Sequence, residues 1–244
     1  MAIFAIGLNT CEKMNDKIVK RIIYSLFRLK YGSSLTLNDT LVRRCQFRIQ
    51  NNGNQINLGR FRMFNSKFFL NGDGNTVTIG DTNQIIYGLS VKIYGSNNIL
   101  EIKNHATIFG LRIVIRGEGC RVTIGEHFSE NINCMITCMG KENYILIGDD
   151  CMFSENIDIW NTDSHQIVDL NGKTINKNKP ILIGNHVWIG KNCTILKGIT
   201  IGNDSIIGMS SVVTNNVDHN SIYVGNPARK VKEGVSWNRN YAIQ

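Results

Sequence analysis

The stretch KPILIGNHVWIGKNCTILKGITIGNDSIIGMSSVVTNNVDHNSIYVGNP, residues 179–227, decides the fold because its apolar residues recur every six positions. The recurring anchors follow one another without a break: Ile183, Ile189, Ile195, Ile201, Ile207 and Val213. An α-helix repeats at about 3.6 residues and a β-strand alternates at about 2, so neither element alone gives a period of six. The stretch therefore predicts a repeat architecture.

A six-residue unit is long enough for one short strand and one tight corner. Three such units close a triangular coil of about eighteen residues, whose anchors point inward and stack on the next coil at about 4.8 Å. One coil cannot bury its own inner face, so several must stack. We expect about seven coils, because anchors also recur upstream at intervals of 21, 23, 22 and 23 residues: Leu58, Ile79, Ile102, Ile124 and Ile147.

The repeat block resembles the hexapeptide-repeat acyltransferases, chiefly over residues 140–232 and including the closing GNPARKVK at 225–232. The resemblance implies an all-β fold, a left-handed parallel β-helix. It also implies a homotrimer in which three chains pack side by side and each active site lies between neighbours. We therefore assign residues 36–232 to a β-helix acetyltransferase domain, followed by a C-terminal tail at 233–244.

The N-terminal segment, residues 1–35, predicts a helical element. Residues 12–31, EKMNDKIVKRIIYSLFRLKY, carry an apolar stripe at helical spacing and a basic opposite face. Two roles fit such an amphipathic α-helix. It either packs on the end of the β-helix, covering the first open coil, or makes a peripheral contact with an anionic membrane surface.

The charge and composition of the chain indicate which kinds of substrate or partner it binds. The net charge is +8 with a pI near 9.2, which favours an anionic substrate. Neither zinc-finger spacing nor interleaved basic and aromatic residues are present in the sequence, so we expect no nucleic acid partner. The seven cysteines show no CxxC spacing, and the apolar N-terminal run ends at Leu8. These features predict a cytoplasmic protein, placed at the inner face of the membrane if the helix docks there.

The six-residue register breaks at residues 160–180, and this excursion carries the best candidate catalyst. The interval from Ile147 to Ile183 is 36 residues, which we interpret as two coils with a polar loop in place of part of the path. His165 lies in this loop, and a histidine is suited to take a proton from an attacking hydroxyl near neutral pH. Asp163 and Asp169 are candidates to orient the imidazole. Related polysaccharide O-acetyltransferases have a similar DSH element, which implies that His165 is the general base.

Two tryptophans are further candidates. Trp188 precedes an anchor and should point outward, where its indole N–H either donates to the developing oxyanion or packs at a trimer contact. Trp160, at the entrance of the excursion, is a candidate wall of the acceptor site. The other histidines lie 21 residues or more apart, so no metal site is expected.

The resemblance implies acetyl-CoA as co-substrate. Contacts carried over from the galactoside-type acetyltransferases fall on Lys191, Met209, Thr214, Asn215, Arg229 and Lys232. Arg229 and Lys232 suit the nucleotide phosphates, or are simply solvated residues of the exit strand. Met209 departs from the small alanine usual at its position, which puts its role as a backbone contact in doubt.

The sequence thus predicts an acetyl-CoA-dependent O-acetyltransferase that acts on a sugar hydroxyl of a bacterial surface polysaccharide. The expected acceptor is an anionic capsular glycan, with a sialic-acid polymer as the leading candidate. The rival functions are a sugar-nucleotide N-acetyltransferase, a xenobiotic acetyltransferase and a non-catalytic β-helix binding module. The first rival often has a nucleotide-binding βαβ domain, and no Gly-rich phosphate loop occurs in the first 50 residues.

Overall fold

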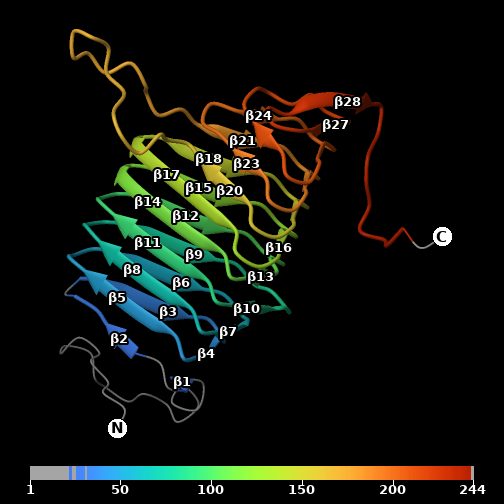
Figure 1. Ribbon diagram of the computed structural model, residues 1–244. Helices are drawn as coiled ribbons and strands as arrows, with labels where there is room; N and C mark the ends of the chain where they lie inside the picture. Colours follow the sequence, from blue (N-terminus) through green and yellow to red (C-terminus); the bar gives the residue numbers. More distant parts are fainter. Residues whose placement is uncertain (1–21, 24–25, 31, 243–244) are drawn as a thin grey trace.

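The chain folds into a three-sided stack of parallel strands, a β-solenoid (Figure 1). The computed structural model describes residues 22–23, 26–30 and 32–242, and every regular element within them is a strand. The predicted all-β parallel helix is therefore confirmed. No described element is a helix with the length and apolarity to cross a membrane.

Each coil contributes one strand to each of three faces. Face 1 is a nine-stranded sheet: β2 (Leu26–Arg28), β5 (Gln46–Gln50), β8 (Lys67–Asn71), β11 (Ser90–Tyr94), β14 (Arg112–Glu118), β17 (Met135–Lys141), β20 (Asp158–Trp160), β23 (Thr194–Ile195) and β26 (Val212–Val213). Face 2 has eight strands: β3 (Ser34–Leu37), β6 (Gln55–Leu58), β9 (Thr76–Ile79), β12 (Ile99–Ile102), β15 (Arg121–Ile124), β18 (Tyr144–Ile147), β21 (Ile181–Ile183) and β24 (Thr200–Ile201).

Face 3 is formed by two sheets that continue one another. The first contains β1 (Ile22–Ile23), β4 (Leu41–Arg43), β7 (Arg62–Phe64), β10 (Ile85–Tyr87) and β13 (Ile108–Phe109). The second contains β16 (Ser129–Glu130), β19 (Met152–Phe153), β22 (Trp188–Ile189), β25 (Ile206–Ile207), β27 (Ser221–Val224) and β28 (Arg229–Glu233). A parallel bridge between Thr107 and Ser129 joins them. Among the strands that the structure describes, only β28 is antiparallel to its neighbour, and it ends the solenoid.

The strand register confirms the repeat predicted from the anchors. The anchors pair coil to coil in the expected order, from Leu58 with Ile79 to Ile124 with Ile147. Ile147 then pairs directly with Ile183. The 36 residues between them are therefore one coil enlarged by a loop, and our interpretation as two coils was wrong. The nine strands of face 1 also exceed the seven coils that we expected.

Residues 12–21, 24–25 and 31 of the predicted N-terminal helix lie outside the described residues, so the helix stays a prediction there. In the described part of this segment, Ile22–Ile23 and Leu26–Arg28 are strands that pair with β4 and β5. The open ladder of the next coil offers backbone partners to this segment. Phe27 also stacks on Phe47 at a centroid distance of 5.1 Å, and so extends the buried column of anchors by one level.

The corner between faces 1 and 2 is held by a ladder of buried asparagines, Asn54, Asn75 and Asn98. In each step the side-chain oxygen accepts from both the backbone and side-chain nitrogens of the next asparagine, at 2.9–3.0 Å. Gly95 at this corner has a φ of +106°, and a Cβ there would meet the oxygen of Gly117 at 2.0 Å. At this corner the glycines leave room for the backbone of the next coil, and the buried asparagines supply the hydrogen bonds between coils.

Candidate active site

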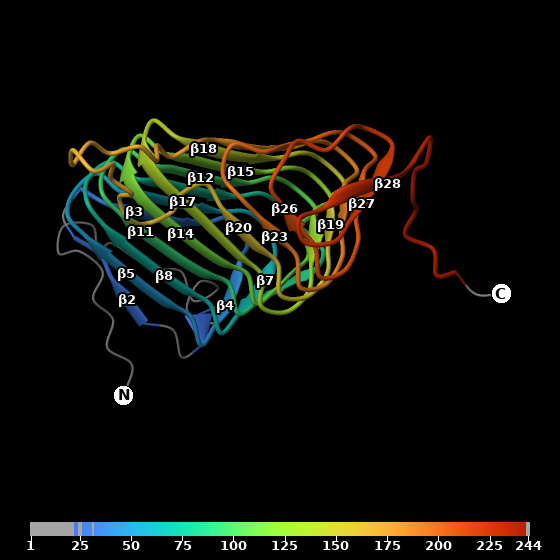
Figure 2. The ribbon, with the colours of Figure 1, turned by 45° about the horizontal axis from the view of Figure 1, so that its top comes forward.

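The loop of residues 161–180 leaves the solenoid at the corner between faces 1 and 2, from the end of β20 to the start of β21. It projects well beyond the coils (Figure 1), and it is also seen at the edge of the solenoid in Figure 2. Buried Asn161 fastens its base, because its side-chain oxygen accepts from the amide of Met139 at 2.8 Å. Its carbonyl oxygen accepts from the amide of Lys179 at 3.1 Å, which closes the two ends of the loop.

Asp163 and Asn176 hold the part of the loop that carries His165. The Asp163 carboxylate accepts hydrogen bonds from Lys197 on the neighbouring coil and from the side chain of Asn176 at 2.7 Å. The same Asn176 side chain donates to the carbonyl oxygen of His165 at 2.9 Å. The Lys197 and Asn176 hydrogen bonds lower the pKa of Asp163 below its ordinary value. The backbone of His165 is thus tied to the solenoid through this network.

The two acidic residues expected to orient the imidazole do not contact it. Asp163 is engaged by Lys197 and Asn176, and Asp169 accepts from the amides of Asn171 and Lys173, each at 2.9 Å. Within the described residues no hydrogen bond reaches the His165 ring, which is exposed. This expectation was therefore wrong: the acids shape the loop instead.

A cavity of about 480 Å³ lies between the loop and the corner of the solenoid. His165 is part of its wall, together with loop residues and with the end of β17 and the start of β18. The lining is largely polar and contains one cation from the solenoid, Lys141 of β17, and one from the loop, Lys177. The cavity is open to solvent, so a large substrate can reach it.

Trp188, the second predicted catalytic residue, lies away from the His165 cavity. It is the first residue of β22 on face 3, and the residue is 37% exposed, so its side chain points outward as predicted. Face 3 is opposite the corner from which the loop leaves, and Trp188 does not line the cavity of His165. One chain therefore does not bring the two predicted catalytic side chains together. Trp160, by contrast, is the last residue of β20 and directly precedes the loop, although it too is outside the cavity lining.

The predicted donor-site residues gather on the last coils. Lys191 and Met209 occupy the corner between faces 3 and 1 one coil apart, with the amide of Ser210 donating to the carbonyl of Lys191 at 2.8 Å. Met209 is 66% exposed, so its bulk faces solvent and does not fill the core. Thr214 and Asn215 follow β26, and the amide of Ala228 donates to the carbonyl of Val212, so the GNPA exit turn packs beside them.

The cations of this region differ in their partners. Lys191 is paired with Glu155 at 2.6 Å, and Lys230 is paired with both Asp218 and Glu233. Arg229 and Lys232 are exposed and form no ion pair with any described residue. The two positions carried over for the phosphates are thus the two that keep their charge available.

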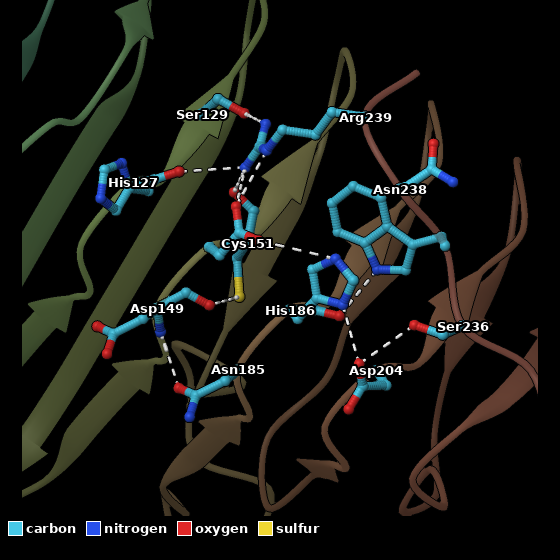
Figure 3. Close-up of polar contacts among 12 residues, drawn as sticks. His127, Ser129, Asp149, Cys151, Asn185, His186, Asp204, Ser236, Asn238 and Arg239 are labelled. Carbon is cyan, nitrogen blue, oxygen red and sulfur yellow. Dashed lines mark hydrogen bonds and ion pairs between the residues drawn. The ribbon is translucent and has the colours of Figure 1, made fainter. Parts of the chain in front are cut away.

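The C-terminal tail packs across face 3 and was missed by the sequence analysis (Figure 3). Trp237 is 9% exposed, stacks on the His186 ring at a centroid distance of 4.2 Å, and donates from its indole to the His186 carbonyl at 2.8 Å. Arg239 forms an ion pair with Asp150 and donates to the hydroxyl of Ser129 at 2.7 Å. The only signal in the sequence was an aromatic and an arginine in a polar tail.

The remaining histidines have structural partners. His186 has its Nδ1 at 2.9 Å from Asp204 and is covered by Trp237. His105 stacks on His127 at 4.6 Å, and His219 bonds to Asn220. No group of three or more metal-ligating side chains occurs among the described residues.

Comparison with known proteins agrees with this architecture. Residues 180–215 match the model of the bacterial transferase hexapeptide family (six repeats). The chain is 34% identical over 147 residues to a polysialic acid O-acetyltransferase of Neisseria meningitidis, covering 52% of this chain and 68% of the relative. It is 34% identical over 117 residues to the galactoside O-acetyltransferase of Escherichia coli K12, covering 47% of this chain and 55% of that protein.

Two solved structures match most of the solenoid. The polySia specific acetyltransferase NeuO superimposes with a TM-score of 0.68 at 27% identity, covering 88% of this chain and 93% of its own. The polysialic acid O-acetyltransferase OatWY gives a TM-score of 0.67 at 30% identity, covering 86% and 92%. The repeat architecture and these likenesses define a hexapeptide-repeat enzyme. The chain belongs to the hexapeptide-repeat acetyltransferase family.

Proposed function

We propose that this acetyltransferase transfers the acetyl group of acetyl-CoA to a sugar hydroxyl of an anionic capsular polysaccharide on a bacterial surface. A sialic-acid polymer is the first acceptor to test. The observation that carries the proposal is the polar cavity at the loop corner, where an exposed histidine faces a space open to a large substrate. The likeness to the two polysialic acid O-acetyltransferase structures supports it, because it covers 86–88% of this chain, including the N-terminal coils.

His165 is the proposed general base. Its neutral imidazole takes the proton of the acceptor hydroxyl while the oxygen forms a bond to the thioester carbon. The C–S bond of the tetrahedral intermediate then breaks, and the proton passes from the imidazolium to the departing thiolate of coenzyme A. Both substrates are bound at once, and no residue carries the acetyl group in between.

A neighbouring copy of the chain is proposed to complete the site. Trp188 is a candidate donor to the oxyanion of the intermediate, because a preplaced N–H group stabilises the charge that develops there. Since Trp188 and His165 lie on opposite sides of one solenoid, the pair can meet only between chains. This geometry supports the homotrimer that the family resemblance implies.

The donor site is proposed to follow the last coils, from Lys191 and Met209 to Thr214 and Asn215. Arg229 and Lys232 are available for the phosphates of coenzyme A, because their charges have no acidic partner among the described residues. Acetyl-CoA is a cytoplasmic metabolite, so we propose that the reaction takes place there. Five buried cysteines are free thiols, which fits a reducing compartment: Cys120, Cys134, Cys138, Cys151 and Cys193.

Incubation with labelled acetyl-CoA and a panel of polysaccharides tests the proposal. We expect incorporation into polysialic acid and much less into neutral glycans of similar length. His165→Ala should lower kcat by about 10²–10⁴-fold, the usual contribution of a general base. Transfer to none of the acidic polymers, or unchanged turnover by His165→Ala, contradicts the proposal.

A further inference from the structure

Unpaired cations gather on face 1 of the first five coils. Its outward positions include six exposed cations: Arg28, Arg48, Lys67, Lys92, Arg112 and Arg116. None of these has a carboxylate partner among the described residues. The only acid in the strands from β2 to β17 of this face is Glu118, which pairs with Lys141 at 3.7 Å. The face therefore presents a positive surface that no described residue neutralises.

The same face carries aromatic rings between the cations, although the linear sequence shows no such interleaving. The strand register places Phe69 between Arg48 and Lys92, and Tyr94 beside Arg116. The Arg48 guanidinium lies 5.6 Å from the centroid of the Phe69 ring, and that of Arg116 lies 4.8 Å from Tyr94. The two rings are 5.5 Å apart. Arg48, Phe69, Tyr94 and Arg116 therefore form a continuous line, which we call the face 1 track.

The face 1 track leads into the cavity of His165. Arg116 pairs with Met139 on β17, and Met139 is part of the cavity wall. Figure 1 shows these strands stacked in order below the corner from which the loop projects. Five steps at about 4.8 Å separate β2 from β17, so the surface extends about 24 Å from the cavity.

The charge is concentrated on this face. In the same coils, the strands of face 2 from β3 to β15 contain only one acid and one cation, Glu101 and Arg121. The strands of face 3 from β4 to β13 contain two cations, Arg43 and Arg62, against the six exposed cations of face 1. A basic surface needed only for solubility has no reason to concentrate on one face of three. The placement indicates a ligand that lies along face 1.

We propose that face 1 binds an extended acidic polysaccharide and delivers it to the His165 cavity. This inference rests on the proposed function and deepens it, because it assigns binding of the polymer to residues outside the His165 cavity. Arginine and lysine side chains suit the carboxylates of successive sugars, and aromatic rings suit the apolar faces of sugar rings. An acidic glycan is favoured over nucleic acid because the track ends at an acetyltransferase cavity.

Binding of polymer by the full chain without acetyl-CoA tests the track separately from catalysis. The test variant is Lys92→Gln combined with Arg116→Gln. The matched control is Arg43→Gln combined with Arg62→Gln, which removes the same charge from exposed positions on face 3. Thermal melting of each variant checks the fold. The probes are polysialic acid, neutral dextran and a single-stranded oligonucleotide, measured by calorimetry over a salt series.

We expect the track variant to weaken the affinity for polysialic acid about five- to tenfold at low salt, the effect of two exposed charge contacts. The control variant should differ from the parent by less than about twofold. Equal affinities of the track variant and the control variant for polysialic acid would contradict the proposal that the face 1 track binds the polymer. Tighter binding of the oligonucleotide than of polysialic acid overturns the assignment to a glycan. Track-dependent binding of a polymer that the enzyme fails to acetylate leaves the track standing and refutes the proposed acceptor.

Discussion

Asp163 offers the sharpest test of how the catalytic loop works. Its carboxylate links Lys197 on the solenoid to Asn176 in the loop, and Asn176 in turn holds the His165 carbonyl. Asp163→Ala removes this anchor but no group that touches the imidazole. A hydrogen bond to a charged group contributes about 1.5–3 kcal/mol, and partial exposure of this pair reduces that to about 1 kcal/mol.

The free energy of the Asp163 anchor predicts how much kcat should fall in the Asp163→Ala variant. About 1 kcal/mol corresponds to a factor of roughly five in the population of the correctly placed loop. We expect Asp163→Ala to lower kcat by about three- to tenfold, far less than the 10²–10⁴-fold loss expected for His165→Ala. The assay is steady-state acetyl transfer from labelled acetyl-CoA to polysialic acid, with Asp169→Ala as a control that alters only a local turn.

The pH dependence separates an anchor from a catalytic partner. The pKa of Asp163 is lowered in the folded chain, so its contribution is complete above the ordinary value of about 3.9 and is lost only as the pH falls through the lower folded value. The anchor is therefore constant between about pH 5 and 9. A hundredfold loss of kcat, or a shifted pH profile in this window, would show that Asp163 acts on the imidazole directly and refute the reasoning.

Three further outcomes can be measured. Asn75→Ala leaves several buried polar groups of the corner ladder without partners and should destabilise the fold by about 3–6 kcal/mol in denaturant unfolding, whereas exposed Asn83→Ala should change it by less than about 0.5 kcal/mol. Arg229→Glu with Lys232→Glu should raise the KM for acetyl-CoA, with a penalty that shrinks at high salt; an unchanged KM at low salt excludes the assignment. Arg239→Ala should release the tail from face 3, seen as faster amide exchange, and normal protection of the tail would contradict this.

The sequence specified the solenoid because the repeat is local. Each anchor sits one coil from the next, so the spacing from Leu58 to Ile147 fixed the register that the strands adopt. The 36-residue interval to Ile183 was misinterpreted because a multiple of eighteen fits two coils as well as one coil with a loop. Spacing alone carries no information on whether the chain in between turns a corner or leaves the solenoid.

The site was only partly predictable. His165 could be selected because a polar break in a regular repeat is visible in one dimension. The role of Asp163 could not, because its partner Lys197 is 34 residues away and belongs to the repeat itself. The tail contacts of Arg239 span 89 residues to Asp150, and nothing in a pattern of anchors encodes such a contact.

The separation of His165 from Trp188 leads to a test of the proposed shared site. If each site takes its histidine from one chain and its tryptophan from the next, His165→Ala and Trp188→Ala should each be nearly inactive when alone. Refolding equal amounts of the two variants together should then restore activity in about one site in four, because that is the chance that an interface pairs the intact histidine with the intact tryptophan. A site built within one chain gives no recovery at any mixing ratio. Absence of recovery in mixed assemblies whose composition is verified by mass spectrometry would therefore place both side chains in the same protomer and refute the shared site.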